Sequence, residues 1–258
     1  MYGRYGLSGS AISWFKSFLS ERKQCVEING SLSKEVTIDS GFSQGGILSP
    51  LLFILLTSDL HLWLEYGEGE GFADDVTTSY SDTDENKVIK KLEEDAVRTL
   101  DFMAANMVSA NPKKTEFLMV RPGKKKGSRT IAIGEATVHE TQHAKLLGLK
   151  ISNDLSWKKH IQDMISELNQ RLGVLKRLCY VFDKKNLKML AEGLVLSKIR
   201  YGISVYSQAR LSDNDPQIGL IQKLQVIQNK AMRIILKKRR IDKVSTDKLL
   251  DYRQKSHI

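Results

Sequence analysis

Two adjacent carboxylates, Asp74 and Asp75, are the residues of this 258-residue chain whose types and spacing most directly suggest chemistry. They follow Phe72 and Ala73 and precede a β-forming run at 76–80, which places them where a strand meets a turn. Like charges this close resist joint ionisation unless a cation neutralises them. Hard divalent cations take oxygen ligands, and two metal ions about 3.5–4 Å apart are a common device for phosphoryl transfer. Taken alone, however, such a pair more often marks a solvated turn.

The elements that would hold this pair are of mixed type. Apolar residues recur at helical spacing over 7–19, and two strands joined by an Asn-Gly turn at 29–30 follow. The apolar stretch 51–63 predicts a buried helix. A charge near the middle of a bilayer is costly, so Asp59 within this stretch argues against a membrane span. The pattern over 85–107 predicts a long helix with one apolar face.

Other segments predict strands first and then helices. The Glu-Gly run at 65–71 has the composition of a poor strand, which would weaken the support of the carboxylate pair. Strands are expected at 115–120 and 146–151, with a hairpin around 134–135. Beyond residue 155 the pattern is helical almost to the end. The tryptophans fall on apolar faces and are expected in the core: Trp14, Trp63 and Trp157.

Charge is distributed unevenly along the chain. Residues 1–120 contain 11 basic and 18 acidic side chains, whereas residues 121–258 contain 29 basic and 12 acidic ones. A strongly basic second half is typical of a protein that binds a polyanion, which here favours nucleic acid. Two cysteines far apart in the sequence provide neither a disulfide framework nor a four-thiolate zinc site.

Three further segments accompany the carboxylate pair in a defined order. Upstream is Gly41-Phe-Ser-Gln-Gly-Gly-Ile-Leu-Ser-Pro, and downstream are Asn111-Pro-Lys-Lys-Thr-Glu-Phe and Leu147-Gly-Leu. In this order and spacing, the set resembles palm motifs B, C, D and E of the reverse transcriptase of a non-LTR (LINE-type) retrotransposon. Segments such as Ser197-Lys-Ile-Arg-Tyr-Gly resemble the helical region that follows in these elements. The resemblance covers nearly the whole chain.

The resemblance implies a role for each residue of the carboxylate segment. Asp74 would bind Mg²⁺ in a two-metal site, and Asp75 would assist there. Phe72 and Ala73 would shape the turn that presents them. Lys114 would lie near the pyrophosphate leaving group and either donate a proton or stabilise its charge.

Other matching residues would contact nucleic acid. Gln44, Gly45 and Gly46 would let the backbone approach the template and the incoming nucleotide closely, where larger side chains would clash. Leu147 and Gly148 would form a turn similar to a primer grip. The basic helical segment would act as a thumb that follows phosphates. The implied partners are therefore an RNA template and a DNA primer.

The sequence departs from the family pattern in the metal ligands and in motif B. The family needs a further aspartate, in motif A, upstream of motif B, and Asp39 lies too close to Gly41 to be that residue. Motif B usually reads Pro-Gln-Gly-Ser, whereas Ser43 and Gly46 stand at its ends here. We therefore expect a fragment that begins between motifs A and B and has little or no activity by itself.

Two other motifs suggest chemistry that the surrounding sequence does not favour. His139, Glu140 and His143 fit the H-E-x-x-H pattern of zinc proteases, which requires a helix, but the neighbouring residues alternate like strands. The lysine-rich loop at 123–128 lacks the spacing of a phosphate-binding P-loop and favours a solvated turn.

The sequence thus predicts an α+β fold. It consists of an incomplete polymerase palm with packing helices at 1–154 and a basic, all-helical thumb-like region at 155–258. The predicted function is a partial RNA-directed DNA polymerase. The alternatives are a non-catalytic nucleic-acid-binding remnant and a retroelement-derived product with no function. We expect an intracellular protein, nuclear or cytoplasmic rather than secreted, because no secretory leader is visible, and the sequence leaves its oligomeric state open.

Overall fold

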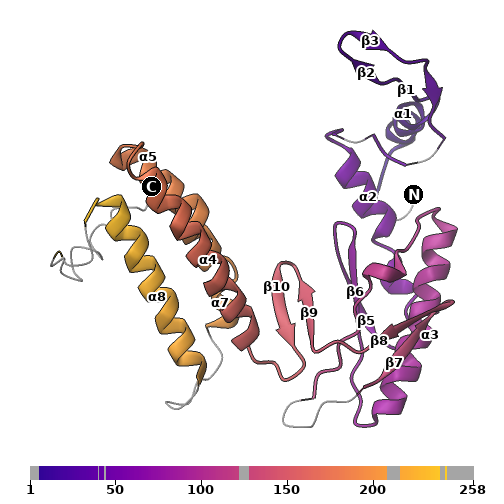
Figure 1. The fold of residues 1–258 in the computed structure, drawn as a ribbon. Helices are drawn as coiled ribbons and strands as arrows, with labels where there is room; N and C mark the ends of the chain where they lie inside the picture. The colour runs from indigo at the N-terminus through magenta and orange to yellow at the C-terminus, as the bar shows by residue number, and fades with distance from the viewer. Residues whose placement is uncertain are drawn as a thin grey trace. The chain divides into compact units, whose positions relative to one another are not determined.

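The computed structural model describes residues 6–39, 41–43, 45–121, 128–207, 216–238 and 242. The chain divides into two compact units: residues 1–115 with 130–138, and residues 116–129 with 139–258. Within the described residues, helices alternate with two-stranded sheets (Figure 1). This mixture confirms the α+β class, while the palm and thumb assignments and their boundary after residue 154 stay predictions.

The first unit begins with a capped helix, followed by a hairpin whose arms each contain two short strands. Helix α1 starts after Ser8, whose hydroxyl accepts a hydrogen bond from the backbone N–H of Ala11 at 3.3 Å. The predicted turn is confirmed, because Asn29 (φ 51°) and Gly30 (φ 81°) join two antiparallel strands in the left-handed conformation that such turns require. The elements are α1 (Gly9–Leu19), β1 (Lys23–Gln24), β2 (Glu27–Ile28), β3 (Ser31–Leu32) and β4 (Val36–Thr37). Strand β1 pairs with β4, and β2 with β3.

The predicted buried helix at 51–63 is wrong in both length and burial. It is divided into α2 (Ser49–Thr57) and a 3₁₀ turn, η1 (Leu60–Leu62), and within 47–64 only Leu52 and Leu60 are buried. An apolar run shows that a helix lacks a polar face, but burial also needs partners that the fold must bring to it. No helix in the described part of the chain is both long and apolar enough to cross a membrane.

The long predicted helix is confirmed as α3 (Glu85–Ala105), which packs against strands of the first unit. Asp84 caps its first turn by accepting the Asn86 N–H at 2.9 Å. The side chain of Glu93 accepts the N–H of Ala132 at 2.8 Å, which ties α3 to the hairpin predicted around 134–135. That hairpin is formed by β7 (Thr130–Ile133) and β8 (Ala136–His139).

Two predicted strands differ in the structure. Segment 115–120 forms no strand and makes only one bridge, between Phe117 and Glu140. Segment 146–151 turns in its middle, because Leu147 and Gly148 connect β9 (His143–Leu146) to β10 (Leu149–Ser152). A continuous apolar stretch does not reveal a reversal at its centre.

The helices of the second unit enclose its core, as the periodicity beyond residue 155 predicts. Helices α4 and α8 lie side by side, with α5 packed against both (Figure 1). The helical elements are α4 (Lys158–Leu178), α5 (Lys184–Ala191), a π-helical turn η3 (Glu192–Leu196), α6 (Ser197–Arg200), α7 (Ile203–Tyr206) and α8 (Pro216–Ile235). Fully buried residues of this core include Ile161, Leu168, Leu175, Leu187 and Ala231. Trp157 packs against it, whereas Trp14 and Trp63 are exposed, so their predicted burial is wrong.

Candidate catalytic hairpin

The carboxylate pair lies at the tip of a regular antiparallel hairpin. Strands β5 (Glu68–Phe72) and β6 (Asp75–Ser79) pair in full register, and the last pair joins Phe72 to Asp75. Ala73 and Asp74 therefore form a two-residue loop. Both aspartates are exposed, so their carboxylates are accessible to a ligand in solution.

The backbone at this tip is strained. Ala73 has φ 54°, a left-handed conformation that disfavours residues with a Cβ atom. A non-glycine residue with positive φ persists only when its surroundings hold it there, and such residues cluster at functional sites. Here the five cross-strand pairs of the hairpin provide that constraint.

The expected weakness of the Glu-Gly strand is wrong, because β5 forms all five pairs with β6. Two glycines of the run at 65–71 lie where a side chain has no room. A Cβ atom on Gly67 would lie 2.7 Å from the carbonyl oxygen of Ser79, and one on Gly69 would collide with the side chain of Leu64. Gly71, by contrast, has open space around it. Composition predicts a poor strand, but close packing explains two of the glycines that give this impression.

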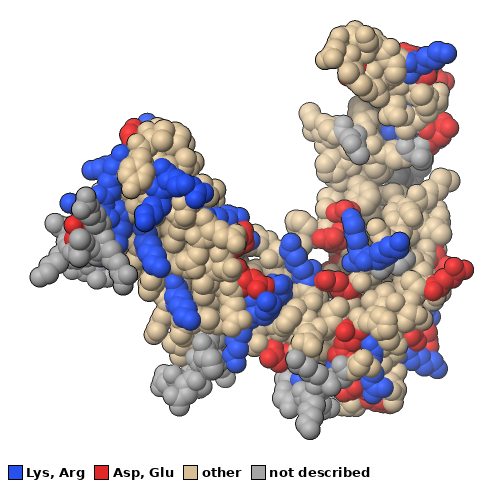
Figure 2. Space-filling view, viewed as in Figure 1, with Lys and Arg blue, Asp and Glu red and all other residues tan. Residues whose placement is uncertain are grey.

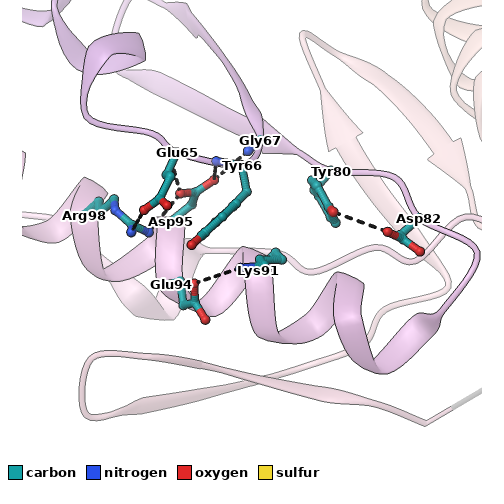
Figure 3. A network of polar contacts seen from close by, with 9 residues as sticks. All are labelled: Glu65, Tyr66, Gly67, Tyr80, Asp82, Lys91, Glu94, Asp95 and Arg98. Atoms are coloured by element: carbon teal, nitrogen blue, oxygen red, sulfur yellow. Dashed lines mark hydrogen bonds and ion pairs between the residues drawn. The ribbon is translucent and has the colours of Figure 1, made fainter.

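A buried carboxylate holds the base of the hairpin. Asp95, from the middle of α3, is fully buried and accepts hydrogen bonds from the backbone N–H groups of Glu65, Tyr66 and Gly67 (Figure 3). Asp95 is not among the residues predicted from the sequence to have a function. Its position on the apolar face of a predicted helix was the available signal, because a charged residue there needs partners once it is buried.

A small pocket lies beside the tip, between α2, η1 and the hairpin. Its volume is about 150 Å³, less than pockets that hold small-molecule ligands usually have. It therefore does not have the size of a nucleotide site. The lining residues are Ile54, Thr57, Ser58, Leu60, His61, Gly69, Glu70, Gly71, Ala73 and Val76.

The other residues implied for nucleotide binding in the first unit belong to the glycine loop and to a short 3₁₀ turn. Gln44 lies outside the described residues. Gly45 has φ 80°, and a Cβ atom on Gly46 would lie 2.7 Å from the hydroxyl of Ser49, so both positions favour glycine. Lys114 is exposed at the end of η2 (Pro112–Lys114) and makes no described hydrogen bond or ion pair with either aspartate.

The turn expected to resemble a primer grip belongs to the second unit. Leu147 (φ 47°) and Gly148 (φ 81°) are both left-handed, as a tight two-residue turn requires. The hydroxyl of Tyr201 donates a hydrogen bond to the carbonyl oxygen of Leu147 at 2.6 Å. A Cβ atom on Gly202 would lie 2.8 Å from the Leu149 side chain, so hairpin and helices pack closely.

Asp74 and Asp75 provide the kind of donor atom that Mg²⁺ prefers, but two residues are too few ligands for a two-metal centre. Carboxylate oxygens suit this cation. Among the residues that the structure describes, however, no group of three or more His, Cys, Asp or Glu side chains lies close enough to hold a metal ion. A two-metal centre would therefore need ligands beyond these two aspartates.

The alternative zinc-protease motif lacks its required helix. His139 ends β8 and His143 begins β9, so the two histidines do not share a helical face. Glu140, the expected base, forms a buried ion pair with Arg121. The structure thus agrees with the interpretation of these histidines as ordinary residues of strands.

Basic side chains gather on the helices of the second unit (Figure 2). Most of them are exposed and come from α4, α5, α6 and α8. The exposed residues include Lys159, Lys176, Arg177, Lys184, Lys185, Arg200, Lys223 and Lys230. These exposed lysines and arginines are together called the basic helical face below.

Comparisons with known proteins identify the family. Residues 4–151 match the family described as reverse transcriptase (RNA-dependent DNA polymerase). The chain is 26% identical over 230 residues to the probable RNA-directed DNA polymerase from transposon X-element of Drosophila melanogaster, covering 85% of this chain and 24% of that protein. It is 24% identical over 245 residues to the RNA-directed DNA polymerase from mobile element jockey of Drosophila funebris, covering 89% and 25%.

The chain thus spans about a quarter of the length of these curated relatives. No solved structure matches it significantly. The family match includes the glycine loop, the carboxylate hairpin and the Leu147-Gly148 turn, and it extends over more than half of the chain. This chain therefore belongs to the reverse transcriptase family and is similar to the RNA-directed DNA polymerases of non-LTR retrotransposons.

Proposed function

We propose that this chain contributes palm motifs B to E and a thumb to an RNA-directed DNA polymerase. The observation that carries the proposal is the position of Asp74 and Asp75, exposed at a strained two-residue turn within a family of polymerases. Such a turn presents two carboxylates to solvent at the end of a supported hairpin. That geometry suits the binding of a divalent cation beside a phosphate.

In this proposal, Asp74 and Asp75 hold Mg²⁺, which supplies charge neutralisation at the reacting phosphate when it is bound. Gln44, Gly45 and Gly46 lie against the template and the incoming nucleotide. The positively charged side chain of Lys114 approaches the pyrophosphate. The expected substrates are an RNA template, a DNA primer and deoxynucleotides.

The proposal for the second unit concerns the primer. Leu147 and Gly148 form a rigid turn, because the turn is hydrogen-bonded to Tyr201. A rigid turn next to a basic helical face would hold the primer end while lysines and arginines contact its phosphates. The thumb at 155–258 is thus proposed to bind the duplex of template and primer.

We further propose that the 258-residue chain by itself extends primers weakly or not at all. The absence of a cluster of three possible metal ligands among the described residues supports this proposal. Misplacing a reacting group by about 1 Å can cost about 100-fold in rate, and a missing ligand should cost more. Activity would then require a further carboxylate from outside the described residues.

A second candidate function, nucleic-acid binding without catalysis, is favoured by the basic helical face. Its exposed lysines and arginines would neutralise phosphates whether or not Asp74 and Asp75 hold a metal ion. Binding of this kind weakens as salt rises, with a slope of about 0.9 per phosphate neutralised on duplex DNA.

Primer extension tests the catalytic proposal. The purified chain would be given an RNA template, a DNA primer, deoxynucleotides and Mg²⁺, beside the double variant Asp74→Ala with Asp75→Ala. Glu68→Gln with Glu70→Gln is the matched control, because it removes two charges from the same hairpin. We expect no extension above the level of the Asp74 and Asp75 variant. Robust extension that only this variant abolishes would contradict the proposed incompleteness.

Binding of the same primer and template, followed by fluorescence anisotropy across salt concentrations, tests the second unit. We expect Lys176→Glu with Arg177→Glu to weaken binding and to lower the salt slope by about 2, since two phosphate contacts are lost. Lys34→Glu with Lys90→Glu, on exposed residues of the first unit, is the control with equal charge change. Equal effects of both pairs would contradict binding through the basic helical face.

A further inference from the structure

The three residues just before strand β5 are held by a carboxylate of helix α3. Asp95 Oδ1 accepts the N–H of Glu65 at 3.0 Å, and Oδ2 accepts those of Tyr66 at 3.1 Å and Gly67 at 2.7 Å. Three successive N–H groups that converge on one anion form a nest. Because the anion is a side chain of α3, the nest joins this helix to the residue before β5.

Neighbouring side chains help to hold the Asp95 carboxylate in place. Asp95 is fully buried, and Arg98, one helical turn later, donates to its Oδ1 at 3.3 Å and also pairs with Glu65. The ammonium group of Lys91 lies 3.3 Å from the centre of the Tyr66 ring (Figure 3). A buried carboxylate needs such partners, because leaving it unpaired is costly.

Gly67 has no room for a side chain between the partner strand and this carboxylate. A Cβ atom there would lie 3.2 Å from Asp95 Oδ2 and 2.7 Å from the Ser79 carbonyl oxygen. The same residue thus meets the nest on one side and the partner strand on the other. Any shift at Gly67 is therefore transmitted directly to the pairing of β5 with β6.

We propose that Asp95 is a positioning residue for the turn that presents Asp74 and Asp75. The nest fixes residue 67, and β5 begins at the next residue, so the nest sets the register that ends in the pair of Phe72 with Asp75. A slip by one residue would turn each side chain to the opposite face of the hairpin. The inference rests on the proposed role of Asp74 and Asp75 as ligands of a divalent cation.

Amide hydrogen exchange of the full chain tests whether Asp95 holds the nest at residues 65–67. In Asp95→Asn, the side chain keeps its shape but loses its charge and one acceptor oxygen. We expect exchange at residues 65–67 and along β5 and β6 to accelerate by about tenfold to a hundredfold. Asp101→Asn, an exposed aspartate on the same helix, is the matched control and should leave exchange unchanged.

A second measurement separates positioning from a general loss of stability. Bound Mn²⁺ broadens the NMR signals of nearby amides, so the wild-type signals of Asp74, Asp75 and Val76 should broaden at Mn²⁺ concentrations that leave other amides sharp. At a temperature where Asp95→Asn is folded, we expect at least about threefold more Mn²⁺ to be needed for equal broadening.

The outcomes distinguish the inference from the function on which it rests. If Asp74→Asn with Asp75→Asn leaves the broadening of Val76 unchanged in an otherwise wild-type chain, the proposed metal role is wrong. If that variant abolishes the broadening while Asp95→Asn does not alter it, the positioning role is overturned.

A milder variant keeps the test decisive if Asp95→Asn does not fold. Arg98→Gln removes the counter-charge and keeps the three N–H bonds of Asp95. We expect amide exchange to accelerate and more Mn²⁺ to be needed for equal broadening, both to a smaller degree than in Asp95→Asn. An unchanged exchange rate at 65–67 together with unchanged Mn²⁺ broadening would overturn the proposal.

Discussion

The hairpin of β5 and β6 and the hairpin of β9 and β10 are both closed by two-residue turns, but they are held at opposite ends. In the first, Asp95 fixes the base, and the tip with Asp74 is exposed. In the second, Tyr201 binds the carbonyl oxygen of Leu147 at the tip itself. An exposed, unattached tip suits side chains that must bind a ligand. A tip held by a hydrogen bond suits a backbone that must keep a fixed conformation.

The second hairpin is also fixed along its side. Lys150 on β10 forms an ion pair with Asp163 on α4, and its backbone N–H donates to His160 Nδ1 at 3.3 Å. One local motif, a tight turn between two short strands, is therefore fixed at its base in one unit and at its tip in the other. The fixed end depends on where distant residues attach.

The largest expected effect comes from disturbing the base of the first hairpin. Gly67→Ala places a methyl group against the Ser79 carbonyl oxygen and the Asp95 carboxylate, so we expect the free energy of unfolding to fall by about 1–3 kcal/mol. Chemical denaturation of Gly67→Ala and of its control measures this change. Gly71→Ala, four residues later within β5 and with open space around it, is the control. Equal decreases in the free energy of unfolding in the two variants would mean that strand propensity, and not crowding at Gly67, causes the loss.

A smaller effect is expected at the tip of the second hairpin. Tyr201→Phe removes the hydroxyl that donates to Leu147, and a neutral hydrogen bond on a half-exposed residue contributes about 0.5–1 kcal/mol. Amide exchange at residues 147–149 should accelerate accordingly, by severalfold. Tyr180→Phe, an exposed tyrosine without a described hydrogen bond, should change nothing. Unchanged exchange in Tyr201→Phe would show that the tip is held by packing alone.

The smallest expected effect is a pH dependence of the second unit. Burial lowers the pKa of His160, and the nearby Lys198 and Lys150 lower it further, against the opposing attraction of Asp163. The unfolded chain therefore binds a proton more readily than the folded one. The contribution to stability is complete above the unfolded pKa of about 6.5 and is lost as pH falls towards the folded pKa.

We expect the free energy of unfolding to decrease between about pH 7.5 and pH 5, and less steeply in His160→Gln. His61→Gln, at an exposed histidine, is the control. Carboxylates with lowered pKa values, such as Asp163, lose their contribution at more acidic pH, below their ordinary range. Parallel pH profiles of the wild type and His160→Gln would contradict the assignment.

The family, the position of the carboxylate pair at a turn and the main helices could be predicted because their signals are local. Asp74 and Asp75 are adjacent, the face of α3 repeats every three or four residues, and Asn29-Gly30 carries its own turn preference. Such signals require only residues within a few positions of one another. The order of the motifs along the chain then indicated a reverse transcriptase, and the family match confirms it.

Features that depend on contacts between distant residues could not be predicted in this way. Asp95 binds Gly67 from 28 positions away, and Tyr201 binds Leu147 from 54 positions away. The Glu-Gly strand is regular because the nest and the pairing with β6 compensate for its poor intrinsic preference. Trp14 and Trp63 are exposed because burial requires a partner surface, and apolar character alone does not provide one.

The order of amino acids is enough to identify the residues available for chemistry: two adjacent carboxylates, a glycine loop and a basic second half. Which end of each hairpin is free depends on the tertiary structure. A hydrogen bond across tens of residues forms only when the whole unit folds, because the entropy lost in closing such a loop must be offset by many other contacts.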